Sequence, residues 1–189
     1  MRLYIIRHGQ SETNLKNYWT GWLDVPLTDK GRADALRAGK IIEGISFDKI
    51  YTSDLSRAMV TCELAIPGAE YETTPLLREV GLGSLEGTPI LKFTTEDKAI
   101  VSESGYAKFG GESLEEFCGR VNEFLEMLKG KEYGTVAAFC HGGWVRAVMD
   151  TVVGIKLPRD KIFCNNCATL VLDLTAEGVW KIHSYINLP

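Results

Sequence analysis

The sequence predicts an α/β sandwich with a mainly parallel sheet. Apolar runs of strand length alternate with segments of helical periodicity, which is typical of strands connected through covering helices. No repeat, low-complexity tract or linker divides the 189 residues. A hydrophobic content of 45% with 24% charged residues indicates a sizeable core. We therefore expect one domain over residues 1–189, with ligands bound beyond the carboxyl ends of the strands.

Five apolar runs have the length of strands. They are short, bounded by polar residues or glycine, and rich in β-branched or aliphatic side chains. The predicted strands are Leu3 to Ile6, Asp48 to Thr52, Val136 to Cys140, Thr169 to Leu174 and Val179 to Ile186.

Helical patterns lie between the first three of these strands. One covers residues 28–43, and a second, residues 55–66, follows the second strand directly. The clearest helix begins with a capping box, in which Ser113 precedes Glu116 by three positions, and it ends before Gly130. Its predicted apolar face consists of Leu114, Phe117, Val121, Phe124 and Leu128.

The charge balance and the cysteines limit the protein's partners and compartment. With 21 Lys and Arg against 25 Asp and Glu, the net charge is −4, and no long basic run is present, so a general nucleic-acid or membrane surface is not expected. No apolar run approaches a membrane span, and Arg7 and His8 interrupt the N-terminal run before a signal peptide forms. The 5 scattered cysteines argue against a disulfide framework. We expect a cytoplasmic protein with reduced thiols.

Cationic and proton-bearing side chains follow three of the predicted strands. The first strand ends in Arg7-His8-Gly9, the second leads to Arg57, and the third ends in His141-Gly142-Gly143. If these strands are neighbours, the side chains converge on one pocket, where helix N-termini after Gly9 and Gly142 add N–H donors. Guanidinium groups bind phosphate oxygens in pairs, so this pattern predicts a site for a dianionic phosphoryl group.

A histidine in such a pocket can attack phosphorus with one ring nitrogen while the other donates to a backbone carbonyl. Asn14 adds a neutral donor, and Gly9 leaves room for the phosphoryl group. The leaving alkoxide needs a proton, for which Glu79 and Glu86 are both candidates. The plainer alternatives are a hydrogen-bonded core histidine at position 141 and a solvated arginine at position 57.

Six separated segments resemble the histidine phosphatase superfamily, also called the phosphoglycerate mutase-like family. The resemblance covers almost the whole chain. The segments are RHGQSETN at Arg7 to Asn14, TGWLDVPLTDKGRADA at Thr20 to Ala35, YTSDLSRAMVT at Tyr51 to Thr61, LREVGLGSLEG at Leu77 to Gly87, GGES at Gly110 to Ser113, and HGGWVRAV at His141 to Val148.

The resemblance implies a three-layer sandwich, with a mixed, mostly parallel sheet flanked by helices. It implies that His8 is the phosphohistidine nucleophile and Glu79 the proton donor and later the base for water, which leaves Glu86 a structural residue in a turn. It also implies that the chemistry needs no metal or other cofactor. The remaining phosphate or substrate contacts implied are Arg7, Arg57, His141, Asn14, Gly142, Thr20 and Gly21.

The sequence favours hydrolysis of a small phosphomonoester over mutase activity. The segment Thr20 to Trp22 is similar to the phosphoglycerate mutases, but those carry Glu-Arg-His-Tyr at the proton donor and a long basic insertion after it. This chain instead has Glu79-Val80-Gly81-Leu82 and a short passage to Gly110. Its Gly-Ser-Leu-Glu-Gly ending at residues 83–87 and its GGES segment resemble the small phosphatase branch, which includes broad-specificity and alpha-ribazole phosphatase-like enzymes. A non-catalytic phospho-ligand binder is the third hypothesis, disfavoured because it needs neither His8 nor Glu79.

Residues 88–109 are expected to form a substrate cap. Aromatic side chains either contact the organic part of the substrate there or pack against each other, and the sequence leaves both readings open. They are Trp19, Trp22, Phe93, Tyr106 and Phe109.

Two further signals are discounted. Cys164 and Cys167 have zinc-ligand spacing, but no second pair accompanies them, so a turn before the strand at Thr169 is the preferred interpretation. His183 lies in a strand pattern and is taken as an ordinary sheet residue. A homodimer is left open by the sequence.

Overall fold

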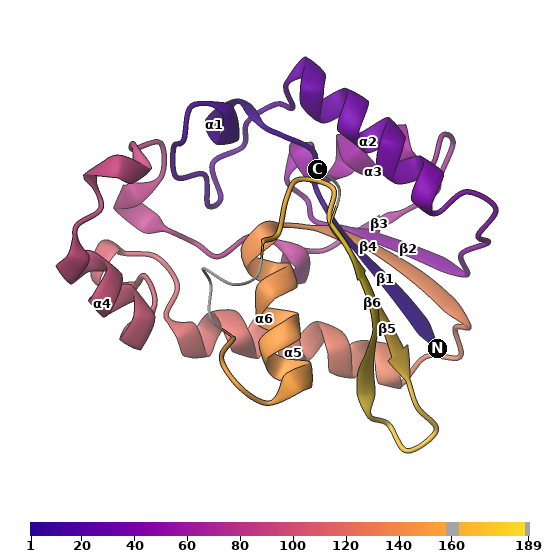
Figure 1. Cartoon of the computed structure of the whole chain (residues 1–189). Helices are drawn as coiled ribbons and strands as arrows, with labels where there is room; N and C mark the ends of the chain where they lie inside the picture. The colour runs from indigo at the N-terminus through magenta and orange to yellow at the C-terminus, as the bar shows by residue number, and fades with distance from the viewer. Residues whose placement is uncertain (158–162, 188–189) are drawn as a thin grey trace.

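A mixed six-stranded sheet forms the centre of the computed structural model, which describes residues 1–157 and 163–187 (Figure 1). The strand order is β3-β2-β4-β1-β5-β6. The first four strands in this order run parallel, whereas β5 pairs antiparallel with both β1 and β6. The strands are β1 (Arg2–Arg7), β2 (Lys49–Thr52), β3 (Glu72–Thr73), β4 (Thr135–Cys140), β5 (Thr169–Leu174) and β6 (Trp180–Ile186).

Helices cover both faces of this sheet and give three layers, as expected. Helices α2 (Asp29–Ile41) and α3 (Ser56–Ala65) lie on one face, and α5 (Leu114–Lys129) and α6 (Gly142–Val153) on the other (Figure 1). Strand β4 is buried on both faces because its side chains alternate between them. Val136 and Ala138 join the core beneath α5 and α6, while Phe139 joins the core beneath α2 and α3.

The predicted helix starts agree with the structure. Thr28 caps α2 by accepting the Gly31 N–H, and Ser113 and Glu116 form the expected capping box at the start of α5. Four of the five predicted apolar residues of α5 are buried, and Leu114 is half-buried. Within the described residues, no helix is both long and apolar enough to span a membrane.

Two short helices lie on the side of the sheet where β1 and β4 end. They are α1 (Glu12–Leu15) and α4 (Thr95–Ser104), and Figure 1 shows α4 farthest from the strands. Helix α4 belongs to the region expected to form a cap. Single 3-10 turns occupy Pro75–Leu77, Gly83–Leu85, Ile90–Lys92 and Ala107–Phe109.

The sheet order brings the three functional strand ends together. Strand β4 lies between β1 and β2, and Arg7 pairs with Cys140 at the end of β1. Beyond the strands, the His8 N–H donates to Cys140 O (2.9 Å) and the Ser53 N–H donates to Phe139 O (2.9 Å). The segments that carry His8, Arg57 and His141 therefore start from one edge of the sheet.

Candidate active site

A cavity of about 260 Å³ opens beside the ends of β1 and β4. It contains the nucleophile candidate His8 and the proton donor candidate Glu79. Apolar and aromatic side chains form much of the remaining wall. The lining residues are Arg7, His8, Asn14, Tyr18, Trp19, Thr20, Gly21, Arg57, Glu79, Val80, Leu82, Ile90, Tyr106, Gly143 and Arg146.

His8 is buried with one ring nitrogen fixed by the backbone. Its Nδ1 donates to the Gly9 carbonyl at 2.6 Å, so the proton resides on Nδ1 and the lone pair on Nε2. Burial lowers the pKa of His8 well below its usual value, and the guanidinium groups of Arg57 and Arg7 lower it further. The imidazole is therefore neutral at neutral pH, which is the state that can act as a nucleophile.

Two guanidinium groups meet beside His8. Arg57 is fully buried and donates to Gly21 O (2.7 Å) and Leu23 O (2.9 Å), so the solvated alternative is wrong. Burial lowers the pKa of Arg57 to about 10. Arg7 donates through Nη1 to Cys164 O. The Nε atoms of both arginines are buried without an acceptor among the described residues. Both side chains line the cavity, which is the space that an anion could occupy.

His141 lies behind the wall of the cavity. Its ring centroid is 5.1 Å from that of His8, and its Nε2 is 2.9 Å from Ser53 Oγ. Burial lowers the pKa of His141, and Arg57, His8 and Arg7 add to the shift. Its Nδ1 is buried without a partner among the described residues. Only one of the two ring nitrogens is therefore hydrogen-bonded, so the alternative of a fully hydrogen-bonded core histidine is met only in part.

Glu79 is held at the start of α6 by two backbone N–H groups. Gly143 N–H donates to Oε2 at 3.0 Å, and Val80 N–H donates to Oε1 at 2.9 Å. Glu86 Oε1 instead accepts the N–H groups of Trp22 (2.8 Å) and Leu82 (3.2 Å) and does not line the cavity. This geometry favours Glu79 over Glu86 as the acid.

The glycines predicted to lie at the phosphate site have different surroundings. A Cβ at Gly9 would overlap Gly31 O, so the space that Gly9 provides is filled by α2 rather than by a ligand. Gly142 lies against the Arg7 guanidinium, with a virtual Cβ 3.1 Å from Nε, whereas Gly143 lines the cavity. Gly21 adopts a φ of 51° and presents its carbonyl to Arg57.

Asn14 and Thr20 both line the cavity. The Asn14 Oδ1 accepts from the Ser11 N–H (3.2 Å) and from Asn166 Nδ2 (3.1 Å), which leaves the Asn14 Nδ2 group to donate. Thr20 Oγ1 lies 2.6 Å from Thr13 Oγ1. Both positions are compatible with substrate contacts.

Comparison with known proteins places the chain in a family. Residues 3–187 match the sequence profile of the histidine phosphatase superfamily (branch 1). The chain belongs to this superfamily. It is 39% identical to a 2,3-bisphosphoglycerate-dependent phosphoglycerate mutase of Azorhizobium caulinodans over 78% of this chain and 79% of that protein.

Solved structures agree with the superfamily fold. A phosphoglycerate mutase of Thermus thermophilus aligns with a TM-score of 0.78 and 31% identity, and the alignment covers 100% of both chains. A candidate alpha-ribazole-5'-P phosphatase of Escherichia coli aligns with a TM-score of 0.85 over 100% of this chain and 96% of that chain. The identity to the latter is 24%, so it supports the fold alone.

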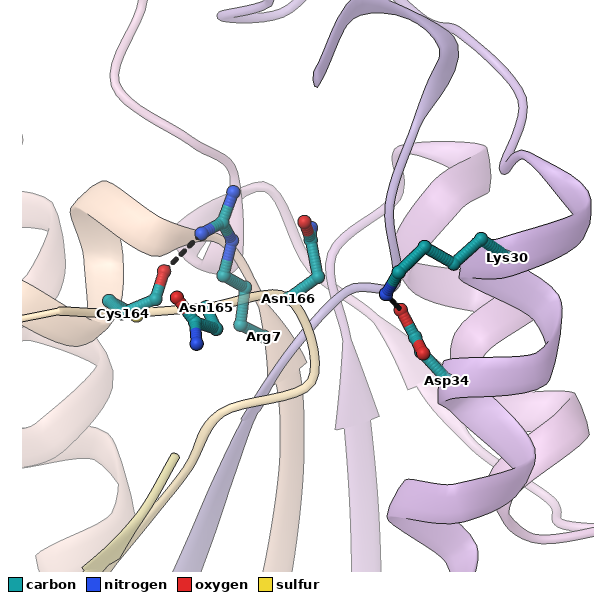
Figure 2. Close-up of a pocket in the computed structure, with 6 residues that line it drawn as sticks. All are labelled: Arg7, Lys30, Asp34, Cys164, Asn165 and Asn166. Atoms are coloured by element: carbon teal, nitrogen blue, oxygen red, sulfur yellow. Dashed lines mark hydrogen bonds and ion pairs between the residues drawn. The ribbon is translucent and has the colours of Figure 1, made fainter. Parts of the chain in front are cut away.

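In this superfamily member, the segment before β5 contributes contacts that the sequence analysis missed. Asn166 Nδ2 donates to His8 O and to Asn14 Oδ1, both at 3.1 Å, and Cys164 O accepts from Arg7. A second cavity of about 210 Å³ separates this segment from Lys30 and Asp34 of α2 (Figure 2). No local pattern signals these contacts, because Asn166 lies 158 positions after His8.

Cys164 and Cys167 form no recognisable metal site. Both are buried free cysteines, and a turn at residues 166–167 precedes β5, as the preferred interpretation expected. Burial raises the pKa of Cys167 to about 12. The described residues contain no group of three or more His, Cys, Asp or Glu side chains arranged for a metal.

The aromatic residues divide into two sets. Trp19 and Tyr106 line the cavity. Phe93 and Phe109 pack behind them, with ring centroids 5.2 Å apart between Trp19 and Phe93 and 6.1 Å apart between Phe93 and Phe109. Trp22 does not line the cavity but donates through Nε1 to Glu79 O at 2.7 Å. Packing is therefore confirmed for Phe93 and Phe109, whereas contact of Trp19 and Tyr106 with the substrate stays a prediction.

Proposed function

We propose that this protein is a phosphomonoester hydrolase that works through a phosphohistidine on His8 and requires no metal. The observation that carries the proposal is the neutral His8 ring, whose Nε2 is left as the free nitrogen of a cavity shared with Arg7, Arg57 and Glu79. The two guanidinium groups supply the positive charge that a phosphoryl group requires.

The first step transfers the phosphoryl group from the ester to the enzyme. His8 Nε2 forms a bond to phosphorus while the bond from phosphorus to the ester oxygen breaks. Arg7 and Arg57 hold the non-bridging oxygens, where negative charge is concentrated. Glu79, protonated at this stage, donates its proton to the leaving alkoxide, and the alcohol departs.

The second step releases the phosphate. The Glu79 carboxylate accepts a proton from water as the water oxygen attacks phosphorus. The bond between phosphorus and His8 Nε2 breaks, and the lone pair returns to the ring. Inorganic phosphate leaves, and both His8 and Glu79 regain their starting protonation states.

The passage after Glu79 favours hydrolysis over mutase activity. It supplies Val80, Leu82, Ile90 and Tyr106 to the cavity wall and no cation. The lysines of residues 88–109 are exposed and do not line the cavity. A mutase must retain a bisphosphate beside the phosphohistidine until the group returns to a second hydroxyl, and the passage after Glu79 supplies no cation for that purpose. Apart from Arg7 and Arg57, the cation that lines the cavity is Arg146, which comes from α6.

Phosphoglycerate mutase activity is the second candidate. It is favoured by the names of relatives such as the Azorhizobium protein, at 39% identity. Mutase and hydrolase share the first step and differ in the acceptor of the phosphoryl group. The second acceptor is an organic hydroxyl in a mutase and water in a hydrolase.

The test measures phosphate release from a panel of phosphomonoesters with and without a chelator, together with interconversion of 3- and 2-phosphoglycerate. We expect chelator-resistant hydrolysis without mutase turnover, and loss of hydrolysis in His8→Ala. His183→Ala is the matched control, because His183 lies on β6 and lines neither described cavity. Efficient interconversion with little phosphate release would make the protein a mutase, and phosphate release by His8→Ala would refute the mechanism.

A further inference from the structure

Arg146 lines the cavity without a role in the steps above. It lies on α6 and is partly buried. Its Nε is buried and has no hydrogen-bond acceptor, and none of its nitrogens makes a hydrogen bond or ion pair that the described residues supply. A guanidinium group carries five N–H donors, and leaving them unsatisfied near a protein interior is costly.

Other arginines around the site have acceptors. Arg78 forms a two-point ion pair with Asp54, at 2.7 and 2.6 Å. Arg120 pairs with Glu112 at 2.8 Å and also donates to backbone carbonyls. The N–H donors of Arg146 are therefore left free to bind a ligand. An anionic group of a molecule bound in the cavity is the partner that the charge and shape of the guanidinium fit.

The position of Arg146 separates it from the phosphoryl pocket. It follows Gly143 by three residues, which places both on one face of α6, about 4.5 Å apart along the helix axis. Gly143 N–H holds Glu79, the group that faces the ester oxygen in the proposed mechanism. Because His8, Glu79 and Arg146 line the same cavity, the alcohol part of a substrate whose phosphoryl group is on His8 would share that cavity with the Arg146 guanidinium.

We propose that Arg146 binds a second acidic group, a carboxylate or a further phosphate, in the alcohol part of the substrate. The inference rests on the proposed function and narrows it to phosphomonoesters that carry an additional negative charge. Neighbouring wall residues from other segments, Val80, Leu82 and Ile90, are apolar. They would desolvate the ion pair and strengthen it.

The test compares matched esters in binding, so that it does not depend on turnover. Isothermal titration of the His8→Asn variant is carried out with 3-phosphoglycerate, which carries a carboxylate, and with glycerol phosphate, which carries a hydroxymethyl group instead. Propanediol bisphosphate tests the phosphate alternative. We expect at least one doubly acidic ester to bind more tightly than glycerol phosphate, and Arg146→Gln to reduce that preference by roughly 10- to 100-fold, the usual range for a charged hydrogen-bonded pair.

Two further variants separate binding from folding. Arg146→Lys keeps the charge and is expected to retain part of the preference, whereas Arg32→Gln removes a charge from an exposed position on α2 and should leave it unchanged. In active enzyme, Arg146→Gln should act mainly on KM for the acidic ester. An equal effect of Arg146→Gln on all three esters, or none, would overturn the inference. Absence of hydrolysis by the parent enzyme would instead refute the proposed function and leave the binding result valid.

Discussion

Lowering the pH from 7.5 to 5.5 should destabilise the folded protein because two buried histidines resist protonation. His8 and His141 have pKa values well below 6.5 in the folded state, chiefly through burial, and each shift is reinforced by the cations Arg57 and Arg7. In the unfolded chain, both titrate near 6.5. The unfolded chain therefore binds more protons than the folded one in this range, and the free energy of unfolding falls as the pH falls.

The expected change follows from proton linkage. A histidine that stays neutral in the folded state and titrates at 6.5 when unfolded costs about 1.4 kcal/mol between pH 7.5 and pH 5.5, so the two together cost about 2.7 kcal/mol. The pKa of Asp54, lowered by its hydrogen bonds to Arg78, produces a loss only at more acidic pH, where such carboxylates protonate.

Urea denaturation in phosphate-free buffer measures this difference at both pH values. His8→Asn preserves a donor near the position of Nδ1, and His141→Gln preserves a polar atom near Nε2. Each variant should recover about half of the pH-dependent loss, and the double variant nearly all of it. A parent protein equally stable at both pH values, or a double variant with the full loss, would refute the assignment of two neutral histidines.

Three substitutions test individual contacts. Glu79→Gln should lower kcat by roughly 10²- to 10⁴-fold through lost proton transfer, and a wild-type rate in steady-state assays would exclude Glu79 as the acid. Arg57→Ala should cost roughly 10²-fold or more in kcat/KM, and a near-wild-type value would place Arg57 outside the reacting geometry. Gly143→Ala adds a Cβ that would overlap Glu79 Oε1, so it should displace the carboxylate and lower kcat by roughly 10²-fold. An unchanged kcat with an unchanged Tm would show that the position of the carboxylate is unimportant.

Much of the fold follows from local sequence patterns. The runs Leu3 to Ile6 and Val136 to Cys140 are apolar throughout because helices cover both faces of β1 and β4. The run Asp48 to Thr52 is apolar only at Ile50 and Tyr51. Two of these runs lead directly into Arg7-His8 and His141, and strand order then decides whether these side chains lie together. The pairing of β4 with both β1 and β2 is a long-range property. The local patterns could treat it only as a condition, and the resemblance to a known superfamily implied a mixed, mostly parallel sheet without a strand order.

The contacts that hold the site residues in place cannot be predicted from local sequence patterns, because they join residues far apart in the chain. Asn166 binds the His8 carbonyl across 158 positions of chain, and Ser53 contacts His141 across 88. The interpretation of Gly9 was incomplete because the neighbour that requires a glycine, Gly31, lies on α2. Arg146 lies inside the matched segment His141 to Val148, but its lack of a partner is visible only when the surrounding side chains are in place.

Trapping the phosphorylated enzyme tests the central claim most directly. The protein is mixed with a phosphomonoester that it has been found to hydrolyse. The reaction is quenched within a single turnover under alkaline conditions that preserve phosphohistidine, and the protein is digested for mass spectrometry. We predict one phosphate on the peptide that contains His8, located at the ring, and none in His8→Asn. Phosphorylation of another residue in the parent protein, or full hydrolytic activity in His8→Asn, would contradict a phosphohistidine mechanism at this site.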